Sequence, residues 1–140
     1  MLFGEMTSFG EACDLMSVAF DSGVSLFDTA EMYPVPQRAE TSGRSEEFVG
    51  RWMKARRREE ITIATKIAGP SGQMSWIRGG PVALDAANIK LAVEGSLRRL
   101  GTDYIDLMQL HWPDRYVPMF GDVDFDPARC FKVLQHIASK

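Results

Sequence analysis

The sequence predicts an α/β protein in which helices alternate with parallel strands. Apolar residues recur at helical spacing in successive segments, and short apolar segments of strand length lie between them. The connections are long enough to be right-handed parallel crossovers. This order fits either a (β/α)8 barrel or a doubly wound sheet, and periodicity does not separate the two. A complete barrel needs about 250 residues, so a chain of 140 is too short for one.

The first helix has both a start signal and a stop signal. Ser8 and Glu11 form a Ser-x-x-Glu capping box, in which each side chain can bond a free backbone amide of the helix start. Gly23 supplies the stop, and 24–27 then reads as a short buried strand that ends at Asp28. The inner stripe of the helix is Ala12, Leu15, Met16, Ala19 and Phe20.

The later elements repeat this alternation. The third helix is the clearest, because Asp85 or Asn88 can cap it and Gly101 can close it. We expect Ile89, Val93, Leu97 and Leu100 to face the sheet, and Lys90, Glu94 and Arg98 to face water. The other expected elements are a helix from about Ser45, a strand from Ile61 to Ile67, a loop over 68–81, a strand from Tyr104 to Leu110 and a short helix over 130–138.

Composition narrows the classes of function. The formal net charge is −3, and the one dense basic run, 54–58, is followed directly by Glu59 and Glu60, which is typical of a solvated helix end and not of a nucleic-acid site. We therefore expect no nucleic-acid partner. No apolar stretch approaches the roughly 20 residues that span a bilayer, so we expect no membrane partner either.

The cysteines and the first residues predict the location. Cys13 and Cys130 match no zinc or redox pattern, so no metal site is expected and a reducing compartment is the default. The first residues lack the pattern of a secretory signal. We expect a cytoplasmic protein, or a plastid protein if a longer form carries a transit peptide.

Polar residues stand at the carboxyl ends of the three expected strands. These are Asp28, Lys66 and His111, and Tyr33 follows closely after Asp28. In parallel α/β proteins, sites assemble at this edge of the sheet. Each residue alone has a structural explanation, as a cap, a solvated cation or a core histidine. Their occurrence at three successive strand ends favours a shared site.

Four motifs carry a family resemblance. The segment 27–33, Phe-Asp-Thr-Ala-Glu-Met-Tyr, resembles the Asp-Thr-Ala-x-x-Tyr motif of aldo-keto reductases. The segments 64–66, 97–106 and 107–113 resemble that family's lysine strand, the approach to its histidine strand, and the histidine strand itself. The resemblance runs from about residue 3 to 131. It is closest to a bacterial and plant subgroup of NADPH-linked reductases that also resembles potassium-channel β subunits.

The resemblance implies a role for each polar residue. Tyr33 would be the general acid, with Lys66 beside it and Asp28 paired to that lysine. A nearby ammonium stabilises the phenolate, so we expect the pKa of Tyr33 to be lowered from about 10. His111 would donate to the substrate carbonyl and orient it. Asp28 would also contact the cofactor.

The resemblance also implies ligands and a reaction. The reaction is hydride transfer from NADPH to a small aldehyde or ketone. Trp76 and Trp112 are expected to bind the substrate. Aromatic residues after a strand are also common in packing, and this alternative applies to Trp112.

The chain departs from the family at both ends. Only Met1 and Leu2 remain of the first barrel strand, and the four strands that follow the histidine strand are missing. We therefore expect a partial (β/α)8 barrel comprising roughly the second to fourth strands with their helices. The chain also lacks a Gly-x-Gly-x-x-Gly turn that could hold phosphates.

We interpret 1–140 as a single incomplete reductase domain whose tail, 130–140, departs from the family. A truncated gene model, an alternative transcript, a frameshift or ordinary divergence would each explain that tail. Open sheet edges could also allow self-association. The expected function is carbonyl reduction that is weak or absent in the isolated chain. The alternatives are a non-catalytic fragment and a regulatory subunit on the same scaffold.

Overall fold

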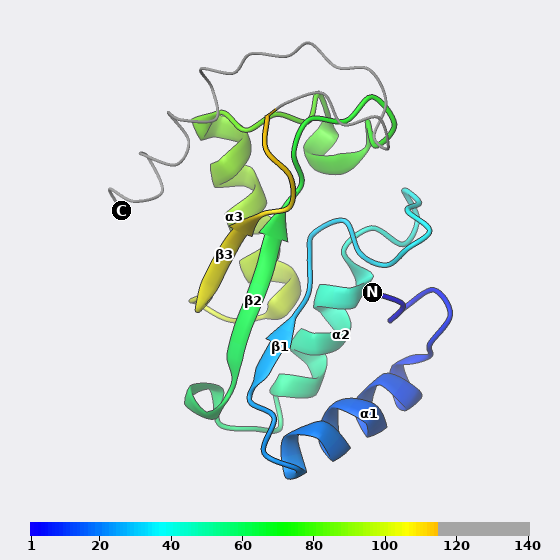
Figure 1. Cartoon of the computed structure of the whole chain (residues 1–140), viewed down its shortest axis with the longest axis vertical. Coiled ribbons are helices and arrows are strands. Elements are labelled where there is room, and N and C mark those ends of the chain that lie inside the picture. Colours follow the sequence, from blue (N-terminus) through cyan, green and yellow to red (C-terminus); the bar gives the residue numbers. More distant parts are fainter. Residues whose placement is uncertain (115–140) are drawn as a thin grey trace.

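The fold is a parallel three-stranded sheet with helices between the strands (Figure 1). The computed structural model describes residues 1–114. The strands pair in the order β1-β2-β3, and both pairings are parallel. The elements are α1 (Phe9–Asp21), β1 (Leu26–Asp28), α2 (Arg44–Met53), β2 (Thr62–Ile67), α3 (Ala86–Leu100) and β3 (Leu107–Leu110), with 3₁₀ turns at Arg58–Glu60 and Ile77–Gly79.

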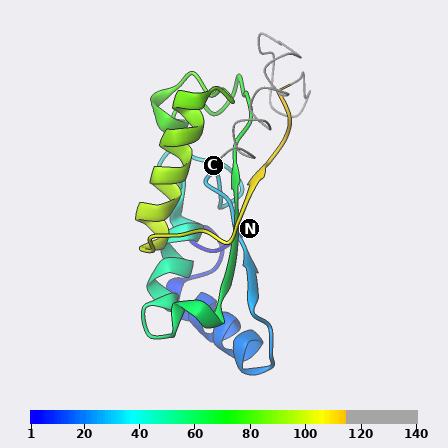
Figure 2. The same cartoon turned by 90° about the vertical axis from the view of Figure 1, so that its left-hand side faces the viewer.

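The register of the strands separates the sheet into two different faces. Lys66 pairs with Gln109, and Asp28 pairs with Ala64. Because side chains alternate along a strand, these four side chains share one face of the sheet. The opposite face is apolar and is covered by α2 and α3, which lie on one side of the sheet in Figure 2.

Most of the core lies between the helices and the covered face. One cluster joins α1, α2 and the sheet, with Trp52 at its centre, and a second joins the end of β2 to the start of α3. Burying these side chains is the main favourable term in forming the sheet–helix layer. The first cluster contains Ala12, Met16, Val49, Trp52, Met53, Ile61, Ile63 and Leu100; the second contains Ile67, Leu84, Ile89 and Ala92.

Helix signals in the sequence correspond to real caps. The capping box of α1 is formed, since the Ser8 hydroxyl accepts from the Glu11 amide and the Glu11 carboxylate accepts from the Ser8 amide. Asp85 caps α3 through the amide of Asn88 at 2.9 Å. Gly101 ends α3 with a φ of 65°, a left-handed conformation that suits glycine.

The predicted faces of α3 are confirmed. Ile89 and Leu100 are buried, Val93 is half-buried against the cluster that joins β2 and α3, and Leu97 is half-buried. The three charged residues predicted to face water, Lys90, Glu94 and Arg98, are all exposed.

Two strands begin later than the sequence predicts. β3 begins at Leu107 and not at Tyr104, because the Asp106 carboxylate accepts the Ile63 amide at 2.8 Å. A side chain thus satisfies an amide that a regular ladder would bond. β1 begins two residues later than predicted, at Leu26, and the prediction that this strand is buried is wrong, since Val24 and Leu26 are both exposed. The expected helix over 130–138 lies outside the described residues.

Candidate active site

Asp28, Lys66 and His111 meet at one edge of the sheet, as the strand ends predict. Asp28 is the last residue of β1, Lys66 lies near the end of β2, and His111 directly follows β3. The Lys66 ammonium donates to the Asp28 carboxylate and, at 2.7 Å, to the carbonyl of Thr29. The other oxygen of Asp28 accepts from the amide of Gln109 at 3.1 Å. Both carboxylate oxygens of Asp28 are therefore bonded.

Tyr33 joins this group from the loop that leaves β1. Its ring meets the His111 ring edge to face, with the centroids 5.4 Å apart. The Lys66 ammonium lies over the Tyr33 ring, 5.2 Å from its centroid. Asp28 thus bonds Lys66, the Lys66 ammonium lies over the Tyr33 ring, and that ring contacts the His111 ring. The four side chains form one continuous group.

Burial sets the charge state of His111. Removal from water, followed by repulsion from Lys66, lowers the pKa of His111 to about 4, although Asp28 acts in the opposite direction. The imidazole is consequently neutral at pH 7. Its Nδ1 is buried and has no hydrogen-bond partner among the described residues.

The predicted lowering of the pKa of Tyr33 is wrong for this structure. Burial raises the pKa of Tyr33, and the negative charge of Asp28 raises it further. The Lys66 ammonium is bonded to Asp28 and to the Thr29 carbonyl, so a carboxylate balances its charge. The phenol is therefore protonated at neutral pH.

The two predicted tryptophans belong to the apolar cluster around Tyr33. Trp112 is buried, stands 5.3 Å from the His111 ring, and donates from its indole to the Pro70 carbonyl at 2.9 Å. Trp76 is half-buried and packs against the same cluster. The buried members of the cluster are Ala30, Met32, Tyr33, Ala68, Met74, Ile77, Val82 and Trp112.

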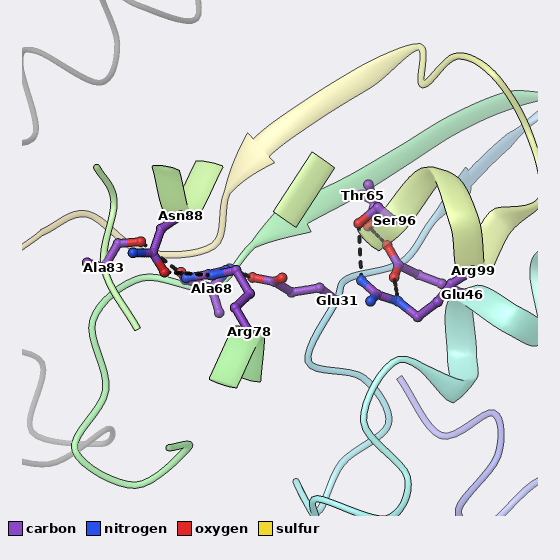
Figure 3. Close-up of polar contacts among 9 residues, drawn as sticks. All are labelled: Glu31, Glu46, Thr65, Ala68, Arg78, Ala83, Asn88, Ser96 and Arg99. Carbon is purple, nitrogen blue, oxygen red and sulfur yellow. Dashed lines mark hydrogen bonds and ion pairs between the residues drawn. The ribbon is translucent and has the colours of Figure 1, made fainter. Parts of the chain in front are cut away.

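Sequence reasoning missed two buried ion pairs, which Figure 3 shows as separate groups. Glu31 pairs with Arg78 beside the site, and Glu46 pairs with Arg99 between α2 and α3 at 2.6 Å. Glu31 sits between the apolar residues Ala30 and Met32, and these two neighbours are the local sequence signal of a buried charge. Gln109 was also missed, although it lies two residues before His111 on the same strand.

Three parallel strands alternate with helices, and the candidate acid–base residues lie at the carboxyl edge of the sheet, so the class is an α/β protein with its candidate site at the strand ends. The family model described as "Aldo/keto reductase family" matches residues 1–139. The chain belongs to the aldo/keto reductase family.

Two curated relatives illustrate the sequence likeness. The chain is 44% identical over 126 residues to "Protein tas" of Escherichia coli, a match that covers 89% of the chain and 36% of that protein. It is 33% identical over 121 residues to a rice protein (Oryza sativa subsp. japonica) called "Probable voltage-gated potassium channel subunit beta", covering 84% of the chain and 33% of that protein. The chain thus spans about a third of the length of these relatives.

Two solved structures share the fold. The aldo-keto reductase AKR11C1 of Bacillus halodurans, in its holo form, matches with a TM-score of 0.65 and 32% identity over 97% of this chain and 40% of its own. A Bombyx mori aldo-keto reductase in complex with NADP matches with a TM-score of 0.60 and 23% identity, over 96% and 39%. These proteins are (β/α)8 barrels, and the three strands described here form part of such a barrel.

Proposed function

We propose that the chain provides the reacting residues for NADPH-dependent reduction of an aldehyde or ketone. Tyr33 is the general acid, His111 orients the carbonyl, and Lys66 and Asp28 support Tyr33. The observation that supports this most directly is the meeting of these four side chains at the carboxyl edge of one parallel sheet. Carbonyl reduction needs both a hydride and a proton, and these residues supply the proton.

The charge states suit that chemistry. A phenol whose pKa is raised by burial holds its proton at pH 7 and can give it to a carbonyl oxygen as negative charge develops there. A neutral His111 has one N–H to donate and does not compete as an acid. The Lys66 ammonium lies 5.2 Å from the Tyr33 ring centroid and is held there by its bonds to Asp28 and to the Thr29 carbonyl.

We propose that the reacting end of the cofactor lies beside Asp28 and Lys66. NADPH, when bound, supplies the hydride. The Asp28 side chain is 49% exposed and the Lys66 side chain is 15% exposed, so this edge is accessible from one face of the sheet. The likeness to the NADP complex concerns the fold alone, and the choice of NADPH is part of the proposal.

Trp76 and Trp112 are proposed to contact the substrate, because both pack in the cluster that contains Tyr33. An apolar cluster beside an acid favours carbonyl compounds with apolar substituents. Trp112 is buried and its indole donates to the Pro70 carbonyl, whereas Trp76 is half-buried.

A second candidate is a regulatory subunit on the same scaffold, which the likeness to the rice protein favours. The four polar residues do not separate the two functions, and association with a channel protein would. Among the described residues, none of the helices has the length and apolar character needed to cross a membrane. A cytoplasmic or plastid location remains a proposal from the sequence.

Self-association is also proposed. Leu26 and Leu107, on the two outer strands of the described sheet, are 53% and 48% exposed, which is unusual for strand residues of this kind. Size-exclusion chromatography with light scattering over a concentration series tests this. Replacing both leucines with lysine is expected to give a monomer.

A hybrid enzyme tests the function. Residues 1–114 would replace the matching segment of the Bacillus halodurans reductase, whose other strands complete the barrel. The hybrid is expected to oxidise NADPH with aldehydes or ketones, and Tyr33→Phe is expected to lower kcat on the order of 10²-fold or more, since that is the usual contribution of a general acid.

Tyr104→Phe is the matched control for the hybrid. Tyr104 precedes β3 at the other end of the sheet, where its ring lies 3.9 Å from the Arg58 guanidinium. This variant is expected to keep its turnover. A folded hybrid without turnover, or with turnover that survives Tyr33→Phe, would contradict the proposed function.

A further inference from the structure

A buried ion pair lies in the wall of the site. The side chains of Glu31 and Arg78 are 3% and 4% exposed, and the guanidinium donates to one carboxylate oxygen of Glu31. The same oxygen accepts the Ala68 amide at 2.6 Å. A buried ion pair stabilises a fold only when its remaining donors are also bonded.

Arg78 meets that condition. Its Nη2 donates to the carbonyls of Ala68 and Ala83, each at 3.1 Å, and its Nε donates to Oδ1 of Asn88 at 3.1 Å (Figure 3). One planar fork therefore bonds four separate places in the chain. Only arginine has donors in this geometry.

Three of the four places, Glu31, Ala68 and Ala83, lie in or directly beside segments that carry candidate site residues, and the fourth, Asn88, lies at the start of α3. Glu31 lies three residues after Asp28 and two before Tyr33, and Ala68 lies two residues after Lys66. The loop between Ala68 and α3 also packs on Tyr33 through Met74, Ile77 and Val82. Arg78 thus bonds the loop to the segment that carries Tyr33.

The backbone of Arg78 indicates that its side chain is needed. With φ 53° and ψ 18°, it is the sole non-glycine residue in 1–114 that has a positive φ. Residues with side chains seldom adopt this left-handed conformation, and they keep it where surrounding contacts hold them. Here the contacts are the bonds of the guanidinium itself.

We propose that Arg78 is a positioning residue: through Glu31 it fixes the segment that bears Tyr33, and through Ala68 and Ala83 it fixes the loop that bears Trp76. The inference rests on the proposed function, because it assigns Tyr33 the acid's role. The Glu46–Arg99 pair provides a matched comparison. Glu46 is fully buried and also accepts from Thr65 at 2.6 Å, but this pair lies between α2 and α3.

The indole N–H signals of the ¹⁵N-labelled 140-residue chain give one readout. The Trp112 indole bonds Pro70 in the site, whereas the Trp52 indole bonds the Ser17 hydroxyl at 3.1 Å in the helix core. Each signal can be assigned by a Trp→Phe variant. Arg78→Met is expected to shift the Trp112 signal and leave the Trp52 signal in place.

The pH titration of the His111 ring gives the second readout, measured in a His136→Gln background that leaves a single histidine. Tyr33 covers His111, so Arg78→Met is expected to move the pKa of His111 from about 4 toward 6.5, with Lys66 and Asp28 still the nearest charges. Arg99→Met is expected to leave both the Trp112 signal and this titration unchanged, although it also removes the ion-pair partner of a fully buried carboxylate.

Unchanged Trp112 and His111 signals in folded Arg78→Met, or equal changes in Arg99→Met, would show that Arg78 has only a structural role. If Arg78→Met does not fold, Arg78→Lys and Arg99→Lys decide by the same outcomes, because lysine keeps the charge but cannot bond all four partners. Neither readout needs cofactor or turnover, so an inactive hybrid would contradict the proposed function without affecting this test.

Discussion

His111 and Tyr33 lie ring against ring, with centroids 5.4 Å apart, and burial is the largest cause of the pKa shift of each. Burial acts in opposite directions on their charged forms: it lowers the pKa of the imidazole and raises that of the phenol. Both groups are therefore neutral at pH 7. A neutral donor and a neutral acid beside the Lys66–Asp28 pair form a site that can release one proton.

The shift of His111 predicts a dependence of stability on pH. The histidine titrates near 6.5 when unfolded and near 4 when folded, so the unfolded chain binds more protons between these values. This group therefore destabilises the fold as pH falls from about 6.5 toward 4, and it has no effect above that window. Urea unfolding at pH 7 and pH 5 should show a larger loss of free energy of unfolding in the unmodified chain than in His111→Gln. Equal losses would contradict the burial of a neutral His111.

Strand ends were enough to predict Asp28, Lys66 and His111, because the edge of a parallel sheet can be located from sequence. The Glu31–Arg78 pair could not be predicted in this way. Its members are 47 residues apart, and their contact depends on the path of a loop. The direction of the Tyr33 shift was also beyond sequence, since it depends on how deeply the phenol is buried.

At the scale of elements, helices were predicted more accurately than strands. Caps are local signals, and α1 and α3 both show the predicted ones. The apolar stripe of α1 was predicted less well, because Leu15 is 59% exposed while Ala12 and Met16 are buried. Strand ends depend on the partner strand, and at Asp106 a side chain replaces a backbone acceptor. Periodicity left a barrel and an open sheet equally possible, and the solved relatives decide for the barrel.

The cap of α3 allows a test at this scale. Asp85→Ala removes the acceptor for the Asn88 amide and is expected to lower the free energy of unfolding by about 0.5–2 kcal/mol. Asp85→Asn is the matched control, because asparagine caps a helix about as well as aspartate. Chemical denaturation of the three proteins makes the comparison. Equal stability of Asp85→Ala and the unmodified chain would show that the cap contributes little.

At the scale of the whole molecule, we infer that the described sheet provides the four polar residues of the proposed site and that the rest of a barrel would hold the cofactor. The chain covers 36% of Tas and 40% of the Bacillus halodurans reductase, yet it contains all four polar residues of the proposed site. Hydride transfer depends on holding the reactants in place. Each lost charge-assisted contact to the cofactor removes roughly 1.5–3 kcal/mol, and about 1.4 kcal/mol corresponds to a tenfold change in affinity.

The most direct test of this account is a titration of the purified 140-residue chain with NADPH by fluorescence, combined with turnover on a panel of aldehydes and ketones. We predict cofactor binding far weaker than micromolar and little or no turnover, although Asp28, Tyr33, Lys66 and His111 are in place. Micromolar affinity, together with turnover that disappears in Tyr33→Phe and persists in Tyr104→Phe, would contradict the account and show that this chain completes the site itself.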